Sequence, residues 1–368
     1  MSRASDGDDS SRVAARFEVR RVAYVDSEGK GVAPLPEFAC DARNLTSIYR
    51  AMVLTRAFDA KAIALQRTGR LGTYPSSLGQ EAVAVGVAAA MRGDDVLVPS
   101  FREHGAQLWR GVTPVELLLF WGGDERGSDF SGPRQDFPVS IPVGSHAPHA
   151  CGVALALKLR GEQRAVVCVV GDGATSKGEF YESLNIAGVW RLPVVFVINN
   201  NQWAISVPRR AQTAAQTLAQ KAFAAGVEGV QVDGNDVIAV RDVVGTAIQS
   251  ARAGMGTTVV ECETYRLSDH TTADDSRRYR DAAEVSGRWK EEPIARLRNH
   301  LVARDAWTKQ DEQQLLAECN RTVAEAAARY LAYPPAAASD MFDYLFATLP
   351  SSLQAERRAL LGEEEPDA

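Results

Sequence analysis

The sequence predicts an α/β fold built on a doubly wound parallel sheet, in which helices cover both faces. Two apolar runs, AVVCVV at Ala165–Val170 and VVFVI at Val194–Ile198, have the length and composition of strands that are buried on both faces. The chain between them is long enough for one helix, expected at 176–190, which would return the chain to the same end of the sheet. A strand, a helix and a second strand in this order form the repeating unit of a parallel sheet.

The N-terminal third is expected to hold a polar tail, an extended arm and two helices. Residues 1–35 contain the tail and, at Phe17–Val32, a short hairpin or extended arm whose turn is Ser-Glu-Gly. The next segment, 41–68, is predicted to be a helix because apolar residues recur with helical spacing at Leu45, Ile48, Tyr49, Met52, Phe58, Ile63 and Leu65. Gly69–Gly79 breaks this helix, and QEAVAVGVAAAM after it predicts a helix of small residues that packs closely.

The remaining chain continues the alternation of helices and strands. Segment 122–144 is rich in Gly, Asp, Ser and Pro, and a loop of that length in a compact protein is usually functional or mobile. The elements predicted after it are a helix at His149–Gly161, strands at Val227–Asp233 and Thr257–Tyr265, and helices at 287–303 and 309–331. No repeat or linker divides residues 36–360, so we expect one domain there, ahead of an acidic tail at 361–368.

Composition and charge argue against several classes of protein. The 368 residues are 45% hydrophobic and 24% charged, and the net charge of −6 argues against a nucleic-acid partner, which would require a basic surface. The apolar runs fall short of the roughly 18 residues of a membrane span, and the polar start of the chain lacks the apolar core of a secretory signal. Five scattered cysteines without metal-ligand spacing are typical of reduced, mostly buried thiols. We therefore expect a globular protein of the cytoplasm.

Small side chains that carry oxygen follow both apolar runs. Asp172 stands between two glycines, and Asn199–Asn201 follow the second run. Ligands of open parallel sheets bind beyond the carboxyl ends of the strands, where glycine lets the backbone approach and the next helix presents free N–H groups. Carboxylate and amide oxygens are ligands for Mg²⁺, which often takes further ligands from phosphate. The pattern favours a diphosphate clamped through Mg²⁺, although a GDG alone is more often a simple turn.

Two common phosphate-binding patterns are missing. No GxGxxG opens a helix, and no GxxxxGK[ST] occurs, which disfavours a dinucleotide site and a nucleotide-hydrolysing site. A GDG followed at this distance by an asparagine pair is instead similar to the thiamine diphosphate signature, with 29 positions between Asp172 and Asn201.

Further motifs occur in a characteristic order along the chain. They are LQRTGRLGTYPSSLGQEA (Leu65–Ala82), PSFREHG (Pro99–Gly105), NNQWAIS (Asn200–Ser206), VDGND (Val232–Asp236) and TYRLSDHTTADDSRRYR (Thr264–Arg280). Together they resemble the alpha subunit of the decarboxylating, first component of 2-oxo acid dehydrogenase complexes, over roughly residues 35–355. The resemblance implies the thiamine-diphosphate-binding fold.

The resemblance also implies how thiamine diphosphate and Mg²⁺ would be held. Asp172, the side chain of Asn201 and the carbonyl of Trp203 would bind the metal ion. Gly173 and Ala174 would give backbone contacts to the diphosphate.

The other implied site residues surround the rest of the cofactor. Phe101 and Arg102 match an aromatic-arginine pair, in which the arginine offers a planar fork of donors to phosphate. The backbone at Ile141 and Val143 would hold the aminopyrimidine ring. His270 would be the catalytic histidine, which contacts the cofactor and assists acyl transfer, whereas a histidine in a polar loop is by itself more often a surface residue.

The implied activity is oxidative decarboxylation of a 2-oxo acid and transfer of the acyl group to the lipoyl group of an acyltransferase component. Only the metal and diphosphate half of such a site is found in the sequence, so the activating glutamate is expected from a beta subunit in an α2β2 heterotetramer. HTTADDSRRYR is similar to branched-chain enzymes and GRLGTY to pyruvate enzymes, so both substrates stay open. The alternatives are an acetoin dehydrogenase alpha subunit and a catalytically silent subunit of the same fold.

Three departures from the family pattern stand out. Ser268-Asp269 precede the histidine where Gly, Pro or His is usual, and the added carboxylate is expected to raise the pKa of His270. His146 stands at a position that is commonly Gln. Asn199 stands at a position that is often Arg or Gln, which would remove one contact to phosphate.

The remaining histidines have weaker predicted roles. His104 could face the phosphate pocket, His146 and His149 are expected to cap a helix or lie in the core, and His300 is expected to face solvent. Three arginines could form a solvated basic run, but the resemblance implies that they order the loop that carries the catalytic histidine: Arg277, Arg278 and Arg280.

Overall fold

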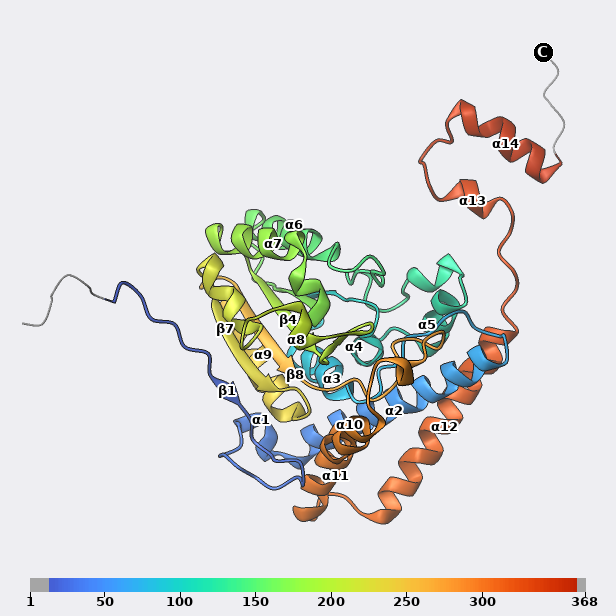
Figure 1. The fold of residues 1–368 in the computed structure, drawn as a ribbon. Helices are drawn as coiled ribbons and strands as arrows, with labels where there is room; N and C mark the ends of the chain where they lie inside the picture. Colours follow the sequence, from blue (N-terminus) through green and yellow to red (C-terminus); the bar gives the residue numbers. More distant parts are fainter. Residues whose placement is uncertain (1–12, 363–368) are drawn as a thin grey trace, which may run out of the picture.

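The computed structural model describes residues 13–362, and its centre is a sheet of six parallel strands (Figure 1). The strand order across the sheet is β1-β7-β8-β4-β3-β2. The strands are β1 (Arg21–Val22), β2 (Val96–Val98), β3 (Val166–Gly171), β4 (Val194–Asn200), β7 (Glu228–Asp233) and β8 (Thr258–Glu263). Helices lie on both faces, so the predicted doubly wound α/β fold is confirmed. The polar stretch at 1–12 and most of the acidic tail lie outside the described residues.

The central strands have the apolar sequence of strands that are buried on both faces. β4 is buried over all seven residues, and β3 and β8 are buried over their first five. Gly171 at the end of β3 lies opposite Asn199 of β4, and Asn200 lies opposite Glu263 at the end of β8. The carboxyl ends of these three strands are therefore level, and the residues that follow them emerge at one edge of the sheet.

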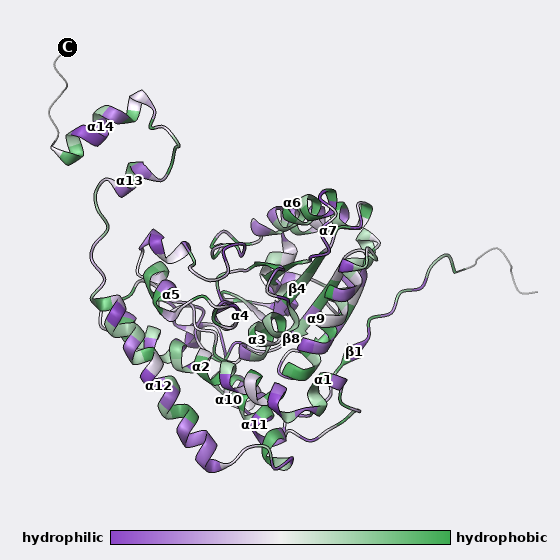
Figure 2. Cartoon of the chain, turned by 180° about the vertical axis from the view of Figure 1, so that it is seen from behind, coloured by the Kyte–Doolittle hydropathy of each residue, from purple (hydrophilic) through white to green (hydrophobic). Residues whose placement is uncertain are grey.

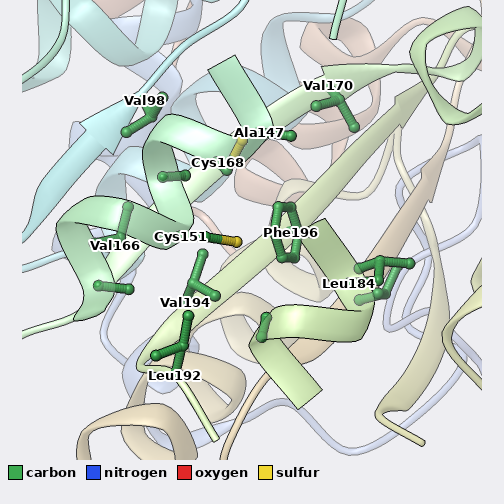
Figure 3. Close-up of a cluster of buried hydrophobic side chains, with 14 of the residues drawn as sticks. Val98, Ala147, Cys151, Val166, Cys168, Val170, Leu184, Leu192, Val194 and Phe196 are labelled. Atoms are coloured by element: carbon green, nitrogen blue, oxygen red, sulfur yellow. The ribbon is translucent and has the colours of Figure 1, made fainter. Parts of the chain in front are cut away.

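One face of the sheet is covered by α6 (His146–Leu159) and α7 (Gly178–Val189). Their inward side chains, among them Cys151 and Leu184, pack in one buried cluster with strand residues such as Cys168 and Phe196 (Figure 3). The helices therefore separate this face of the sheet from solvent.

The opposite face is covered by α3 (Glu81–Ala90) and α9 (Val237–Arg252). A Cβ added to Gly86 of α3 would lie 2.8 Å from Cγ1 of Val240, so the two helices approach closely. The prediction that the helix of small residues packs closely against a neighbour is confirmed.

A further layer of helices lies outside α3. It contains α2 (Ala42–Arg67), α5 (Pro114–Trp121), α11 (Pro293–Ala303) and α12 (Lys309–Leu331), and α4 (His104–Arg110) lies between this layer and the sheet. α12 buries Leu315, Cys319, Val323 and Ala327 against this layer, whereas Leu316 and Leu331 are 44% and 45% exposed.

The short hairpin or extended arm expected at Phe17–Val32 has features of both. Its Ser27–Gly29 turn lies between Val25 and Gly31, which form an antiparallel bridge, while β1 extends along the edge of the sheet and pairs in parallel with β7. The helix predicted at 287–303 is interrupted: α10 (Ala282–Arg288) ends first, and α11 begins at Pro293, since proline is favoured at the first position of a helix but not within one.

The C-terminal arm, residues 335–361, extends away from the body of the molecule (Figures 1 and 2). It contains α13 (Asp340–Asp343) and α14 (Ser351–Leu361), and α14 has no buried residue. Met341, Tyr344 and Leu345 are between 66% and 80% exposed. The arm therefore carries large apolar side chains that the described residues leave uncovered.

Two expectations from composition can also be compared with the structure. Within residues 13–362, none of the helices combines the length and apolar character that are needed to cross a membrane. All five cysteines are free thiols and four of them are buried, as predicted.

Candidate functional site

A cavity of about 300 Å³ lies at the carboxyl edge of the sheet. Its lining includes all but one of the cofactor-binding, metal-binding and catalytic residues that the resemblance implies: Phe101, Arg102, Val143, Asp172, Gly173, Ala174, Asn201, Trp203 and His270. Ile141 is the exception, because its side chain is 51% exposed and lies outside the cavity lining. Residues from distant parts of the chain are thus brought to one place.

The strand order explains why these residues meet. Arg102 follows β2, Asp172 follows β3, Asn201 follows β4 and His270 lies in the loop after β8. These four strands are neighbours in the sheet and run in the same direction. Side chains that follow them must therefore converge beyond one edge, which is where open α/β sheets bind ligands.

The turn after β3 is tight and closely packed. Residues Asp172–Ser176 form a 3-10 turn, and α7 begins only at Gly178, two residues later than the predicted 176. A Cβ on Gly173 would lie 2.7 Å from the Cβ of Ala204, so only glycine fits against β5 (Trp203–Ala204). The ammonium of the buried Lys221 donates to the carbonyl of Thr175 and holds the turn in place.

The three predicted metal ligands are buried and hydrogen-bonded. Asp172 is 3% exposed, its Oδ2 accepts from Nε2 of Gln212 at 2.8 Å, and burial raises the pKa of its carboxyl. The Asn201 amide donates to Oε1 of Gln80 at 2.8 Å, and its oxygen accepts from the backbone N–H of Trp203 at 3.2 Å. A buried carboxylate whose charge is disfavoured by desolvation is a strong acceptor for a cation.

The Trp203 carbonyl accepts a hydrogen bond from Nη1 of Arg266 at 3.4 Å. A carbonyl oxygen has two lone pairs, so this bond leaves one acceptor position. Arg266 is fully buried and was not singled out from the sequence, since nothing in its spacing sets it apart from other arginines of the loop.

The donor set of the cavity fits Mg²⁺ only together with a phosphate ligand. Within residues 13–362, no group of three or more His, Cys, Asp and Glu side chains could hold a metal ion, and Asp172 is the carboxylate placed for one. Mg²⁺ commonly combines one or two protein carboxylates with phosphate oxygens. Two buried polar atoms of the lining, Nε2 of Gln80 and Oδ1 of Asn199, have no hydrogen-bond partner among the described residues. Buried polar atoms without a partner are rare in folded proteins and are consistent with a polar ligand or ion at this place.

Two residues beside the metal ligands have a left-handed backbone. Gln202 has φ 73° and Ile205 has φ 54°. A β-branched residue rarely adopts this conformation, and Ile205 lines the cavity while its carbonyl accepts from Nη2 of Arg266 at 2.8 Å. Strain of this kind is typical of functional sites.

Arg102 is anchored by a buried polar network. Its Nη1 donates to the carbonyl of Ser76, and the hydroxyl of Ser76 donates to the carboxylate of Asp59 in α2. The guanidinium is 5% exposed, and burial together with the nearby Arg266 lowers its pKa to about 10. It stays charged at neutral pH and is held at the cavity wall.

The environment of His270 contradicts the predicted rise of its pKa. Nη2 of Arg102 lies 3.2 Å from its Nδ1, and Nη1 of Arg266 lies 3.4 Å from the same nitrogen. Burial, then Arg102 and Arg266, lower the pKa of His270 to about 4, while Asp274 opposes them only weakly. Asp269 does not face the ring, because its carboxylate accepts hydrogen bonds from the backbone and hydroxyl of Ser276.

The tautomer of His270 follows from these neighbours. Arginine has no acceptor, so Nδ1 must be unprotonated and accept from Arg102. The proton of the neutral ring is then on Nε2, which is free to donate. The ring of Phe101 meets the imidazole edge to face, with 5.9 Å between centroids.

The loop around His270 is ordered by one of the three predicted arginines. Arg280 donates to the carbonyls of Arg266 and Ser268. Arg277 pairs with the neighbouring Asp275 at the surface, and Arg278 is exposed. Residues on either side of His270, such as Thr271, line a separate cavity of about 980 Å³, so the loop forms a wall between two cavities.

The other histidines lie outside the site. His104 is fully buried, accepts from Nε1 of Trp121 at 3.0 Å and does not line the cavity, so the prediction that it faces phosphate is wrong. His300 is 6% exposed and bonds the carbonyl of Gly29, so it does not face solvent as predicted. His146 is a core residue, as predicted, and bonds the carbonyl of Val169 at 2.8 Å.

Comparison with known proteins agrees with the fold and the site. A family model described as "Dehydrogenase E1 component" matches residues 49–339. The match covers most of the chain, which therefore belongs to this family, the first components of 2-oxo acid dehydrogenases. The resemblance found in the motifs is confirmed.

Individual relatives carry two kinds of name. The 3-methyl-2-oxobutanoate dehydrogenase subunit alpha of Mycobacterium tuberculosis is 41% identical over 317 residues, covering 86% of each chain. The pyruvate dehydrogenase E1 component subunit alpha of Bacillus cereus is 34% identical, covering 96% of this chain and 95% of its own. The subunit of the same name from Acholeplasma laidlawii is 40% identical, covering 81% and 88%.

Proposed function

We propose that this chain is the alpha subunit of a cytoplasmic 2-oxo acid dehydrogenase that binds thiamine diphosphate and Mg²⁺. The observation that carries the proposal is the convergence of Arg102, Asp172, Asn201 and His270 from four parallel strands on one cavity. Named relatives over nearly the whole chain support it, and they favour this function over an acetoin dehydrogenase or a silent subunit.

Each residue has a role that follows from its chemistry. Asp172, Asn201 and the Trp203 carbonyl would hold Mg²⁺, and Gly173 and Ala174 would present backbone N–H groups to the diphosphate. When bound, thiamine diphosphate supplies the nucleophilic carbon and the electron sink for decarboxylation.

Arg102 and His270 come from loops and would contact the cofactor and the acyl acceptor. Arg102 would neutralise phosphate charge with its planar guanidinium. His270, neutral and with its proton on Nε2, would donate a hydrogen bond toward the cofactor and the lipoyl group during acyl transfer.

The proposed partners are a beta subunit, in an α2β2 heterotetramer, and a lipoylated acyltransferase component. Within the described residues the cavity lining includes one further carboxyl, that of Glu103, whose pKa is raised to about 7 by burial. Glu103 is 2% exposed and accepts from the backbone N–H of Arg102, so it lies at the diphosphate end. The activating glutamate of the aminopyrimidine would thus come from the partner. Turnover of the assembled subunits with pyruvate and with 3-methyl-2-oxobutanoate decides between the two substrates.

The proposal is tested by Asp172→Ala. The change removes the carboxylate that would hold Mg²⁺, so calorimetry is expected to show loss of Mg²⁺-dependent thiamine diphosphate binding. Burial disfavours the charge of Asp172, so its removal should leave the thermal unfolding midpoint nearly unchanged. Glu182→Ala, an exposed change further along α7, is the control and should bind normally. Unaltered cofactor affinity in Asp172→Ala would rule out the metal assignment.

A further inference from the structure

A lysine that the sequence did not single out lines the cofactor cavity. Lys177 is the residue that precedes α7, directly after the Asp172–Ser176 turn. Its side chain is 44% exposed, and the aliphatic part of it passes Gly144, because a Cβ on Gly144 would lie 3.4 Å from its Cδ. Gly144 also lies beside Ala174 of the turn, so the side chain of Lys177 lines the cavity next to the turn.

The position of Lys177 is not explained by the stability of the helix. The start of a helix carries a partial positive charge, so a cation there is unfavourable, and Lys is not among the residues that cap helix starts. The side chain of Lys177 makes no capping hydrogen bond. Its ion pair with Glu179, at 3.3 Å, joins two side chains that are each 44% exposed, and such pairs contribute little.

The two buried arginines of this region have most of their donors engaged within the protein. Arg102 donates to Ser76 and to His270, and Arg266 donates to the carbonyls of Trp203 and Ile205. Among residues 13–362, the ammonium of Lys177 is held by the exposed pair with Glu179, and a lysine side chain reorients easily. It can turn to an anionic ligand without breaking a buried hydrogen bond.

The sequence departs from the family pattern at one expected phosphate contact. Asn199 stands at a position that is often Arg or Gln in the family, and its buried Oδ1 is without a partner among residues 13–362. A neutral amide cannot offset the negative charge of a diphosphate, whereas an arginine at this position could. Mg²⁺ and Arg102 would offset much of that charge, and a further cation beside the turn after β3 would strengthen the binding.

We propose that Lys177 binds the diphosphate of the cofactor and supplies the positive charge that Asn199 does not. The assignment rests on the proposed function and adds a residue to it. The helix that Lys177 precedes starts beside the turn whose backbone faces the same group, so the ammonium and the turn would hold the diphosphate from two sides.

The test is calorimetric titration of the full chain, assembled with its beta subunit, with thiamine diphosphate and Mg²⁺. Lys177→Gln is expected to raise the Kd about tenfold, and Lys177→Arg is expected to restore most of the affinity. Binding by Lys177→Gln should also depend less steeply on salt concentration. The matched control is Lys309→Gln, because Lys309 is likewise exposed at the start of a helix but lies on α12, away from the cavity.

The outcomes separate this proposal from the function on which it rests. Unchanged affinity and salt dependence in Lys177→Gln would overturn the role of Lys177 alone. A raised KM for the 2-oxo acid with an unchanged cofactor Kd would also overturn it, since it would mean that Lys177 binds the substrate carboxylate. Failure of the unmodified assembly to bind thiamine diphosphate would instead overturn the proposed function.

Discussion

At the scale of single residues, His270 shows how a local sequence pattern can mislead. Asp269 is its neighbour in sequence, and a neighbouring carboxylate ordinarily favours the imidazolium. In the structure Asp269 bonds Ser276, the ring is partly buried, and Arg102 from a distant segment and Arg266, four residues away, face it instead. Burial and the two arginines therefore reverse the sign of the pKa shift.

The protonation of His270 is the first property to test at this scale. In the chain without cofactor, NMR titration is expected to give a pKa of about 4, well below the usual 6.5. Binding of the diphosphate should raise this pKa, because its negative charges oppose those of Arg102 and Arg266. Asp269→Asn is the control and should shift the pKa little, whereas Asp274→Asn should lower it further. A fall of more than one unit in Asp269→Asn would contradict this assignment.

The lowered pKa of His270 also makes the stability of the fold depend on pH. A histidine whose folded pKa is depressed stabilises the fold fully above its unfolded pKa, and that contribution is lost as pH falls toward the folded value. His104, whose pKa burial lowers to about 3, acts in the same sense. Both histidines therefore lower the unfolding free energy as pH falls from about 6.5 to 4, whereas Glu103, whose pKa burial raises to about 7, acts in the opposite sense over an overlapping range.

Residues of the site differ in how far the sequence could reveal them. Asp172 and Asn201 follow apolar runs, and the rule for parallel sheets places them together. Lys177, Gln80 and Arg266 contact the site through packing, which no spacing rule encodes. One feature of the sequence could have pointed to Lys177, since it is a cation at the start of a helix that follows the turn proposed to bind the diphosphate.

At the scale of elements, the strands and helices with the longest apolar or periodic sequence patterns could be predicted best. β3, β4 and α2 have long apolar or periodic sequences and were predicted within a few residues. β2 has three residues, too few for a pattern to emerge, yet it positions Arg102. The parallel pairing of β1 with β7 could not be predicted, because the two strands are far apart in the sequence.

A network between elements connects the outer helices to the site. Trp121 of α5 donates to His104 of α4, which lies 3.2 Å from the hydroxyl of Tyr74, and this hydroxyl donates to Asp59 of α2 at 2.9 Å. Asp59 is 3% exposed and also accepts from Ser76, whose carbonyl holds Arg102. The position of Arg102 therefore depends on a carboxylate that lies outside the cavity.

Replacement of Asp59 tests this dependence. Asp59→Ala leaves several buried donors without an acceptor, so the unfolding free energy is expected to fall by about 3 kcal/mol. Affinity for thiamine diphosphate should fall as well, because Arg102 loses its anchor. Asp59→Asn keeps one acceptor oxygen and should lose less of both. If denaturant unfolding and cofactor titration of Asp59→Ala match the unmodified chain, the network does not position Arg102.

At the scale of the whole molecule, the body and the C-terminal arm differ in how they are stabilised. The body buries its apolar residues in several clusters around the sheet. The arm exposes Met341, Tyr344 and Leu345, and α14 buries nothing. Figure 2 shows apolar segments along the arm where it stands clear of the body. Apolar surface of this kind marks an interaction site, and the proposed beta subunit is the partner that this function requires.

Removal of residues 335–368 tests this role of the arm. The shortened chain keeps Tyr333, which stacks on Arg126, so the body should unfold within a few degrees of the full-length temperature. Stable subunit interfaces often bury more than about 2,000 Å², and loss of the arm should reduce that area. Light scattering after size exclusion is therefore expected to show dissociation of the α2β2 assembly at higher concentration than for the full chain.

The paired variant Tyr344→Ser, Leu345→Ser tests the same surface without shortening the chain, and its assembly should also dissociate at higher concentration. Its control is Glu356→Gln, a polar change on α14 that leaves the apolar side chains in place. An assembly as stable without the arm as with it would mean that the beta subunit binds elsewhere, and that the exposed residues of the arm serve another contact.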